Sequence, residues 1–389
     1  MTLRAARTGR PAPATVYPAP VTGVVETLDH AQRRFTPVSF PLGVFYKFFD
    51  DQGNYLAAIV TYYAFIAIFP LMLLGSSILG FLLQGNAHLQ QEVLNSALRQ
   101  FPIIGDELGR QELHGSTSAI VVGGLTATYG AMGLGQAIQN TVNIAWSVPR
   151  NSRPNPILLR LRSLVLLATA GFAVLGVSVL ATVGSHTDVL GTNGTSTSWL
   201  RWLIQILSFL IIGAMLTLLF RLATTRDHPL KFAAPGAFTL ALMWQSLQWI
   251  GAYYVQHVIQ ATNHMNQTFA LVLGLVGLLY IASVMGVLGI EVNVVLARRL
   301  WPRALLTPFT DRVDLTEADR RAYAGYALMQ RHKGFQTVAV TFDGRDGNTH
   351  EIVMDPSWLA KTRRIRIRRD DFVENPHLPG EETPDDLDD

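Results

Sequence analysis

Residues 231–291 read KFAAPGAFTLALMWQSLQWIGAYYVQHVIQATNHMNQTFALVLGLVGLLYIASVMGVLGIE. Between Lys231 and Glu291 lie 59 positions without an Asp, Glu, Lys or Arg. About 20 apolar residues in a helix cross the hydrocarbon core of a bilayer, so this run is long enough for two crossings. The polar but uncharged segment 256–268 marks the turn between them. The sequence therefore predicts a transmembrane helical hairpin, 233–257 and 268–297, with Glu291 as a carboxylate inside the second arm.

The composition of the whole chain points the same way. Of its 389 residues, 49% are hydrophobic and only 15% are charged, and the mean hydropathy is +0.26. Such values indicate a polytopic membrane protein with soluble ends. The absence of cysteine excludes disulfides, thiolate metal sites and cysteine nucleophiles. The first apolar run begins near Tyr55, behind a basic arm, so we expect no cleavable signal peptide.

Four further apolar runs complete the predicted bundle. They cover about 55–83, 118–146, 161–183 and 202–220, each long enough to cross a bilayer as a helix. The second run is rich in small residues, which allows helices to approach closely. We therefore predict an all-α integral membrane protein, a bundle of six transmembrane helices within 35–300. Between the first two spans, residues 89–101 carry apolar side chains at helical spacing and predict a short helix on the membrane surface.

The loops between the predicted spans differ in positive charge. Loops on one side carry 16 Lys and Arg residues, and loops on the other side carry three. Lys and Arg accumulate on the cytosolic side of membrane proteins. We therefore expect the N-terminus and the C-terminus to be cytosolic.

The chain ends are predicted to be soluble. Residues 1–34 are basic and rich in Pro and Ala, which predicts a flexible arm. The aromatic-rich segment 35–49 suits either an amphipathic helix in the membrane interface or burial against the bundle. Residues 301–369 predict a small cytosolic α/β appendage, with a helix to about His332 started by the capping pattern Thr316 to Asp319 and a strand at 335–342. Residues 361–369 carry six cationic side chains and 370–389 form an acidic, disordered tail; the two either pair with each other, or the basic run lies on anionic lipid.

Several segments together resemble the YihY/BrkB family of bacterial inner-membrane proteins, also labelled UPF0761 or ribonuclease BN. The segments are 51–70, which ends on Pro70, Phe101-Pro102 with Gly105-Asp106, 137–146 followed by Pro154, and 289–293, in which Gly-Ile-Glu replaces the family's Gly-Ala-Glu. The resemblance covers roughly 45–299 and implies the six-helix architecture. It implies no particular activity, because the family has no settled biochemical function. The chain departs from the family pattern at Thr268-Phe269-Ala270, where a Tyr-Gly pair is usual, and it lacks the usual proline near 221–225.

Polar residues on three predicted spans fall in the same cytosolic third of the bundle. They predict one polar cavity, open to the cytosol, that admits an ion or the headgroup of a substrate. The residues of this set are Asp51, Asn143, Trp146 and Glu291, and Gln136, Asn140 and Asn293 are further cavity candidates. Gln245 and Gln248, on another span, are candidates for a path through the bundle. Some of these residues have a structural alternative: Asp51 caps the first span, Trp146 is an interfacial anchor, Gln245 and Gln248 join helices, and Glu291 bonds to Asn143 or to a loop arginine near Arg160 or Arg226. Pro70 is either a gate hinge or a static kink.

Signatures of enzymatic chemistry are absent from the sequence. His257 and His264 match no HxxxH or HExxH pattern, and no phosphate-binding loop is present. The basic run 361–369 lacks interleaved aromatic residues, so we expect no nucleic-acid partner. We expect no metal, no cofactor and no enzymatic activity.

Three functional hypotheses follow. The first is a transporter-like protein that handles a lipid or another amphiphile. The second is a non-catalytic scaffold for envelope integrity whose tail binds a cytosolic partner, and the third is a membrane-tethered ribonuclease. The expected partners are membrane lipids and either a second copy of the chain or a cytosolic protein.

Overall fold

The fold was analysed in a computed structural model of the chain. The structure describes residues 2–4, 23–82, 117–185, 197–224, 229–257, 267–307, 309–310, 313–343 and 349–354. The predicted surface helix at 89–101, the Phe101-Pro102 and Gly105-Asp106 segment, the basic run 361–369 and the acidic tail 370–389 lie outside these residues.

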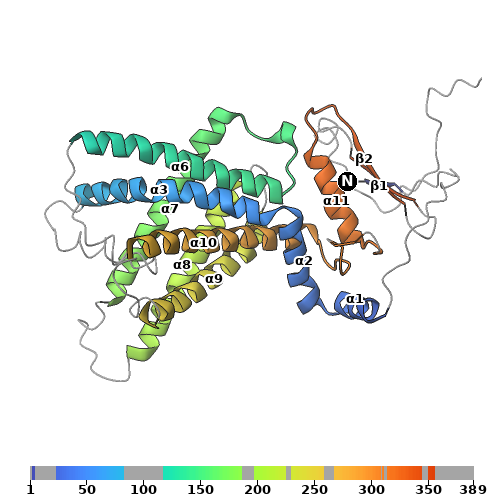
Figure 1. The fold of residues 1–389 in the computed structure, drawn as a ribbon, viewed down its shortest axis with the longest axis horizontal. Coiled ribbons are helices and arrows are strands. Elements are labelled where there is room, and N and C mark those ends of the chain that lie inside the picture. The colour runs from blue at the N-terminus through green and yellow to red at the C-terminus, as the bar shows by residue number, and fades with distance from the viewer. Residues whose placement is uncertain are drawn as a thin grey trace, which may run out of the picture.

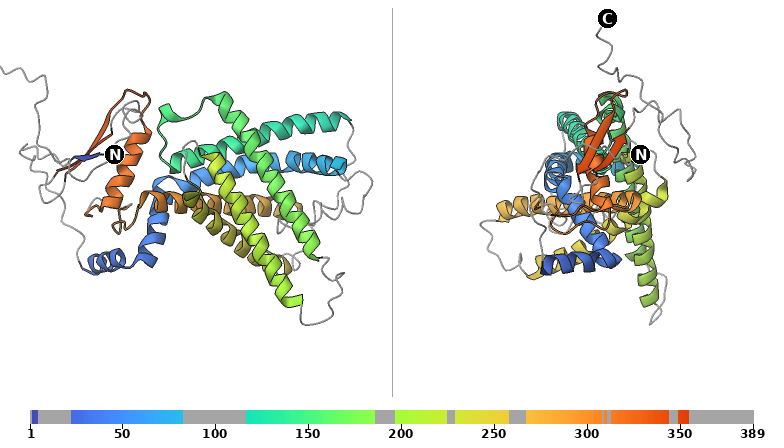
Figure 2. Two further views of the ribbon diagram at one scale, coloured as in Figure 1. Left: turned by 180° about the vertical axis from the view of Figure 1, so that it is seen from behind. Right: turned by 90° about the vertical axis from the view of Figure 1, so that its right-hand side faces the viewer.

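Six long helices form the main body (Figure 1). Each coincides with one of the six predicted spans, within a few residues at each end, so the helical segments are confirmed. Each helix packs against the next in the chain, and the last packs against the first, which closes the bundle. In the view from behind, the third and fourth of these helices are inclined across the others (Figure 2). The helices are α3 (Gly53–Leu82), α6 (Thr117–Ala145), α7 (Pro156–Ser185), α8 (Thr197–Ala223), α9 (Leu230–His257) and α10 (Gln267–Arg298).

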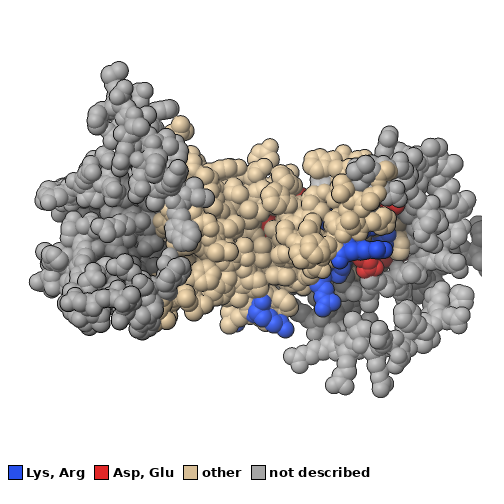
Figure 3. Space-filling model, turned by 90° about the horizontal axis from the view of Figure 1, so that it is seen from below, with Lys and Arg blue, Asp and Glu red and all other residues tan. Residues whose placement is uncertain are grey.

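The outer face of the bundle is apolar. Tyr55, Leu125, Ile157 and Phe172 are between 69% and 80% exposed. Figure 3 shows a broad area without Lys, Arg, Asp or Glu, and the charged side chains gather toward one end. Among the described residues, the segments Ile206–Ala223 and Val272–Arg298 are long and apolar enough to cross a membrane. Apolar exposure on this scale is typical of a surface that contacts lipid.

Glycines allow α9 and α10 to approach closely. Gly236 of α9 faces Gly289 of α10, and a Cβ atom on Gly236 would lie 1.8 Å from the Gly289 carbonyl oxygen. The adjacent Pro235 interrupts the hydrogen bonding of α9, and the backbone N–H of Gly236 donates instead to Oδ1 of Asn293 at 2.7 Å. The contact between the two helices therefore depends on a residue without a side chain.

Gly236→Ala is expected to destabilise the protein by about 3 kcal/mol, because α9 and α10 must separate to accept the methyl group. The measurement is the free energy of unfolding in detergent micelles. Gly277→Ala, on α10, is the control, since a Cβ atom there meets nothing within 4 Å. Equal stability of the two variants would contradict the close-packing argument.

Two shorter helices precede the bundle, α1 (Val24–Arg34) and α2 (Thr36–Asp50). The prediction of a flexible arm is therefore wrong for 24–34, where Asp29 accepts hydrogen bonds from the backbone N–H of Leu305 and from Gln32. Helix α2 lies across one end of the bundle and packs against α10 and α3 (Figure 1). It buries Tyr46 and Phe48 and exposes Phe45 and Phe49. Burial against the bundle is therefore confirmed for one face of the helix, and the location of the other face in the membrane interface stays a prediction.

The C-terminal part packs at the same end. Helix α11 (Glu317–Met329) begins at a capping box formed by Thr316 and Asp319, which confirms the predicted helix. The predicted strand is present as β2 (Val338–Asp343) and pairs with β3 (Thr349–Met354). The sheet order is β1-β3-β2 and antiparallel, with Val340 opposite Ile352. Strand β1 (Thr2–Arg4) comes from the arm predicted to be flexible, and the sequence analysis missed it.

Candidate functional site

Three charged side chains meet where α2 crosses the end of the bundle. Lys47 in the last turn of α2, Asp51 just after α2, and Glu291 on α10 are 1%, 5% and 0% exposed. Lys47 and Asp51 are four residues apart, a spacing that brings side chains together on one helix face, and they form an ion pair. The Lys47 Nζ atom lies 3.7 Å from Oε2 of Glu291. The buried Lys47 ammonium group therefore forms ion pairs with two buried carboxylates.

Helix α11 covers these residues. Tyr326 and Ala322 pack against the core formed by the ends of α2, α6 and α10, and Lys47 Nζ lies 5.1 Å from the Tyr326 ring centroid. We call Lys47, Asp51, Glu291 and Tyr326 the Lys47 cluster. Burial, and next the charges of Asp51, Asp50 and Glu291, raise the pKa of Tyr326 well above its ordinary value. The Tyr326 hydroxyl is therefore neutral at physiological pH.

Several polar atoms of the Lys47 cluster lack hydrogen-bond partners among the described residues. They are both carboxyl oxygens of Glu291, Oδ1 of Asp51 and the hydroxyl of Tyr326. Buried polar atoms are nearly always paired in folded proteins. Four such atoms in one cluster make it the candidate functional site of the described residues.

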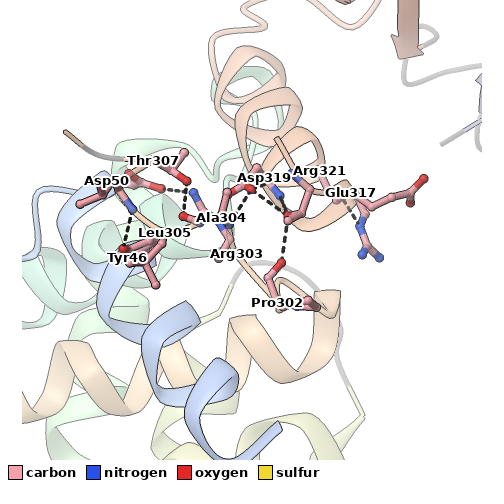
Figure 4. A network of polar contacts seen from close by, with 12 residues as sticks. Tyr46, Asp50, Pro302, Arg303, Ala304, Leu305, Thr307, Glu317, Asp319 and Arg321 are labelled. Carbon is pink, nitrogen blue, oxygen red and sulfur yellow. Dashed lines mark hydrogen bonds and ion pairs between the residues drawn. The ribbon is translucent and has the colours of Figure 1, made fainter. Parts of the chain in front are cut away.

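A second polar network fastens α11 beside the cluster (Figure 4). The Arg303 guanidinium is fully buried, forms an ion pair with Asp319 and donates to Oδ2 of Asp50 at 2.9 Å. Asp319 also accepts from the backbone N–H groups of Ala304 and Thr316, at 3.0 and 2.9 Å. We call Asp50, Arg303 and Asp319 the Arg303 clamp. It joins the last residue of α2 to the first turn of α11.

The pKa values of Asp50, Arg303 and the neighbouring Tyr323 are all shifted from their ordinary values. Burial raises the pKa of Asp50, although Arg303 opposes this effect. Burial alone would lower the pKa of Arg303, but the charges of Asp319 and Asp50 outweigh it and raise the value. Burial, followed by the Asp50 charge, raises the pKa of Tyr323 on α11 to about 12. The guanidinium therefore stays charged, and the clamp holds as an ion pair at physiological pH.

The structure brings four predicted residues to this end of the bundle. Asp51 and Glu291 belong to the Lys47 cluster, while Asn143 and Trp146 are buried in the last turn of α6 and just after it. The Trp146 carbonyl accepts from Arg298. The prediction of an open cavity differs from the structure: these four side chains are at most 5% exposed and line no opening among the described residues, because α11 packs over them.

Other predicted residues make different contacts. Asn293 accepts from Gly236 and joins α10 to α9, and Asn140 is exposed and accepts from Arg153 at 3.2 Å. Gln136 is half-buried on α6. Its neighbour Gln139, which sequence reasoning missed, joins α6 to α7 through the Leu159 carbonyl and Ser163.

The remaining predicted residues lie farther along the bundle. Gln245 and Gln248 are half-buried on α9, and Gln245 lies about 14 Å beyond Gly236 at 1.5 Å per residue. They are therefore not part of the Lys47 cluster. Pro70 lies within α3, but its side chain is outside the described part of the structure, so the hinge stays a prediction.

Sequence reasoning also missed Lys47 and Arg303, two almost completely buried cations at this end. The signal available for Lys47 was its four-residue spacing from Asp51. Arg303 had no local signal, because its partner Asp50 is 253 positions away. Within the described residues, no group of three or more His, Cys, Asp and Glu side chains has an arrangement suited to a metal ion.

Comparison with known proteins places these residues in a family context. The family described as virulence factor BrkB matches residues 44–310. That range includes Lys47, Asp51, Glu291 and Arg303, and it ends before α11.

Two curated proteins are similar to the chain. The putative ribonuclease-like protein YfkH of Bacillus subtilis (strain 168) is 22% identical over 274 residues, covering 67% of this chain and 96% of the relative. A UPF0761 membrane protein of Halorhodospira halophila (strain DSM 244 / SL1) is 28% identical over 205 residues, covering 49% of this chain and 44% of the relative. No solved structure gives a significant match.

Proposed function

The chain belongs to the BrkB family of membrane proteins, and on that premise we propose that it is a transporter-like protein that handles a lipid or another amphiphile. The proposed path begins at the end of the bundle that α11 covers. The partners under this proposal are membrane lipids and no nucleic acid.

The proposal includes the arrangement in the membrane. All six long helices cross the bilayer, and both termini lie in the cytosol. The closed packing of the six helices and their exposed apolar side chains support this arrangement. So does the excess of Lys and Arg in the loops on one side. The Lys47 cluster then lies at the cytosolic end of the bundle.

Glu291 is the observation that carries the proposal. It is completely buried in a helix apolar enough to cross a membrane, and neither carboxyl oxygen has a hydrogen-bond donor among the described residues. Ionisable groups inside membrane helices are costly and mostly mark pathways for ions or substrates. A purely structural carboxylate would be expected to have its oxygens paired.

Helix α2 supports an amphiphile as the substrate class. Its outer face exposes Phe45 and Phe49, whereas its inner face carries Lys47. Helices of this kind lie in the membrane interface, with aromatic side chains among the lipid headgroups and acyl chains. A lipid headgroup at this surface is one helix diameter from the Lys47 cluster. Helix α11 closes the end, so passage requires α11 to move.

Lipid mass spectrometry on protein extracted directly into native nanodiscs tests the proposal. We expect one lipid or amphiphile to be enriched with the wild type and with the Glu317→Gln control, whose side chain is exposed on α11. The double variant Glu291→Gln with Asn143→Ala is expected to lose that enrichment. The same bulk lipid in all three samples would contradict the proposal.

The Arg303 clamp favours a second candidate, a scaffold whose appendage binds a cytosolic partner. The clamp fixes α11 and the three-stranded sheet on the bundle, and β2 is an edge strand of that sheet, a position that can pair with another chain. In this case, removal of 302–389 abolishes function in cells and Glu291→Gln is silent. Neither candidate is an enzyme, and metal-dependent RNA cleavage by the purified protein would contradict both.

A further inference from the structure

We infer that Asp51 and Glu291 together bind one exchangeable proton beside the buried Lys47 ammonium group. The inference rests on the proposed function only for the role of the proton, which is exchanged during transport. The argument concerns the charge, the geometry and the surroundings of the Lys47 cluster.

The charges of the cluster do not balance without a proton. Lys47 supplies one positive charge, whereas Asp51 and Glu291 supply two negative charges when both are ionised, and all three side chains are at most 1% exposed. An uncompensated buried charge is strongly unfavourable. One added proton makes the group neutral and needs no extra space.

The contacts of the two carboxyl groups assign the proton to them. Asp51 uses one oxygen for Lys47, and its Oδ1 has no partner among the described residues. Asp51 and Glu291 both contact the Lys47 ammonium group, so the two carboxyl groups lie close to each other. Ionised carboxylates only accept hydrogen bonds, so two of them bond to each other only when one carries a proton. A shared proton would therefore join Oδ1 of Asp51 to one of the two carboxyl oxygens of Glu291.

The other acids at this end are compensated differently. Asp50 is paired with Arg303 and is partly exposed. Asp319 is paired with Arg303 and accepts two backbone N–H groups at the positive N-terminal end of α11. Among the described residues, the ion-pair contact of Glu291 is with Lys47, and Glu291 lies far from the N-terminus of its helix. The proton therefore belongs to the Lys47 cluster and not to the Arg303 clamp.

The surroundings favour a proton over a metal cation. The Lys47 ammonium is 3.7 Å from Glu291 and pairs with Asp51, so a cation bound by these carboxylates would be repelled at contact distance. Arg298, which also faces this end from α10, adds to the repulsion. From α11, the hydroxyls of Tyr323 and Tyr326 are the remaining titratable groups. Tyr326 covers the cluster, so exchange of the proton requires its displacement or transfer through its hydroxyl.

Infrared difference spectroscopy of the full chain in nanodiscs, recorded as the pH is raised, tests the inference. A protonated carboxyl group absorbs separately from a carboxylate. We expect the wild type and Glu317→Gln to show a buried protonated carboxyl that disappears at alkaline pH, and Glu291→Gln to lack it. Asp51→Asn is expected to keep the band and lose it at a lower pH than the wild type, because one negative neighbour is gone.

Three spectroscopic results would contradict the proton site. No titrating carboxyl band in the wild type, or an unchanged band in Glu291→Gln, overturns it. Where Glu291→Gln does not fold, an Asp51→Asn band that titrates as in the wild type overturns it as well. If the infrared experiment shows the titrating carboxyl band but mass spectrometry shows no lipid enrichment in nanodiscs, the proton site is supported and the proposed function is overturned. Failure of the inference can therefore be told apart from failure of the proposed function.

Discussion

Lys47→Met is expected to destabilise the protein by about 3–5 kcal/mol. Removing one partner of a buried ion pair leaves the other as an uncompensated charge, which costs this much in proteins. Here the ammonium faces two buried carboxyl groups, Asp51 and Glu291, and the methionine side chain supplies no donor to either of them. The measurement is the free energy of unfolding of the purified protein in detergent micelles.

Two comparisons separate charge from packing at Lys47. Lys231→Met on α9 is the control, because Lys231 is exposed and its substitution is expected to change stability by less than about 0.5 kcal/mol. Adding Asp51→Asn and Glu291→Gln to Lys47→Met removes the buried negative charge of the two carboxyl groups and is expected to recover most of the lost stability. A Lys47→Met protein as stable as Lys231→Met would show that the cluster is not held by charge.

Arg303→Met is expected to release α11 from the end of the bundle. The substitution leaves Asp50 and Asp319 without their buried cation and costs about 3–5 kcal/mol in the attachment of the appendage. Hydrogen exchange is the measurement, since local opening of α11 accelerates exchange of its amide groups. Exchange in the six long helices is expected to change little, because their packing does not involve Arg303.

Arg321→Met provides the matched control for Arg303→Met. Arg321 lies on α11 and donates only to the exposed carbonyl of Glu317, one turn earlier. Exchange in α11 is therefore expected to stay near the wild-type rate. Equal rates in the two variants would mean that α11 is held by its apolar contacts, such as those of Ala322 and Tyr326, and not by the clamp.

The Arg303 clamp and the Lys47 cluster are adjacent, since Asp50 and Asp51 are neighbours in the chain. Helix α11 contributes Asp319 to the clamp and Tyr326 to the cover of the cluster. Release of α11 would therefore expose the cluster to the cytosol under the proposed topology. The appendage and the buried carboxylates act together in the transport proposal, and the scaffold proposal needs only the appendage.

The long helices and the capped helix α11 could be predicted from the order of residues alone. Charge-free apolar runs of about 20 to 30 residues have few structural alternatives, and the Thr316 and Asp319 pair forms a capping box through contacts only three residues apart. Glu291 could also be identified from the sequence, because a carboxylate inside a long apolar run is rare and easily recognised. These are local signals, and a local signal is readable from the order of residues alone.

The partners of the buried charged residues and the covering of the site by α11 depend on tertiary packing and could not be predicted from the sequence. In the sequence, Lys47 is one cation within an aromatic segment. Its contact with Glu291 arises from the packing of α2 on α10. Arg303 meets Asp50 across 253 positions, and strand β1 pairs with β3 from the opposite end of the chain. The predicted open cavity is covered because α11 folds back over the end of the bundle. Long-range pairing depends on how helices and strands pack together, and neither hydropathy nor residue spacing records that.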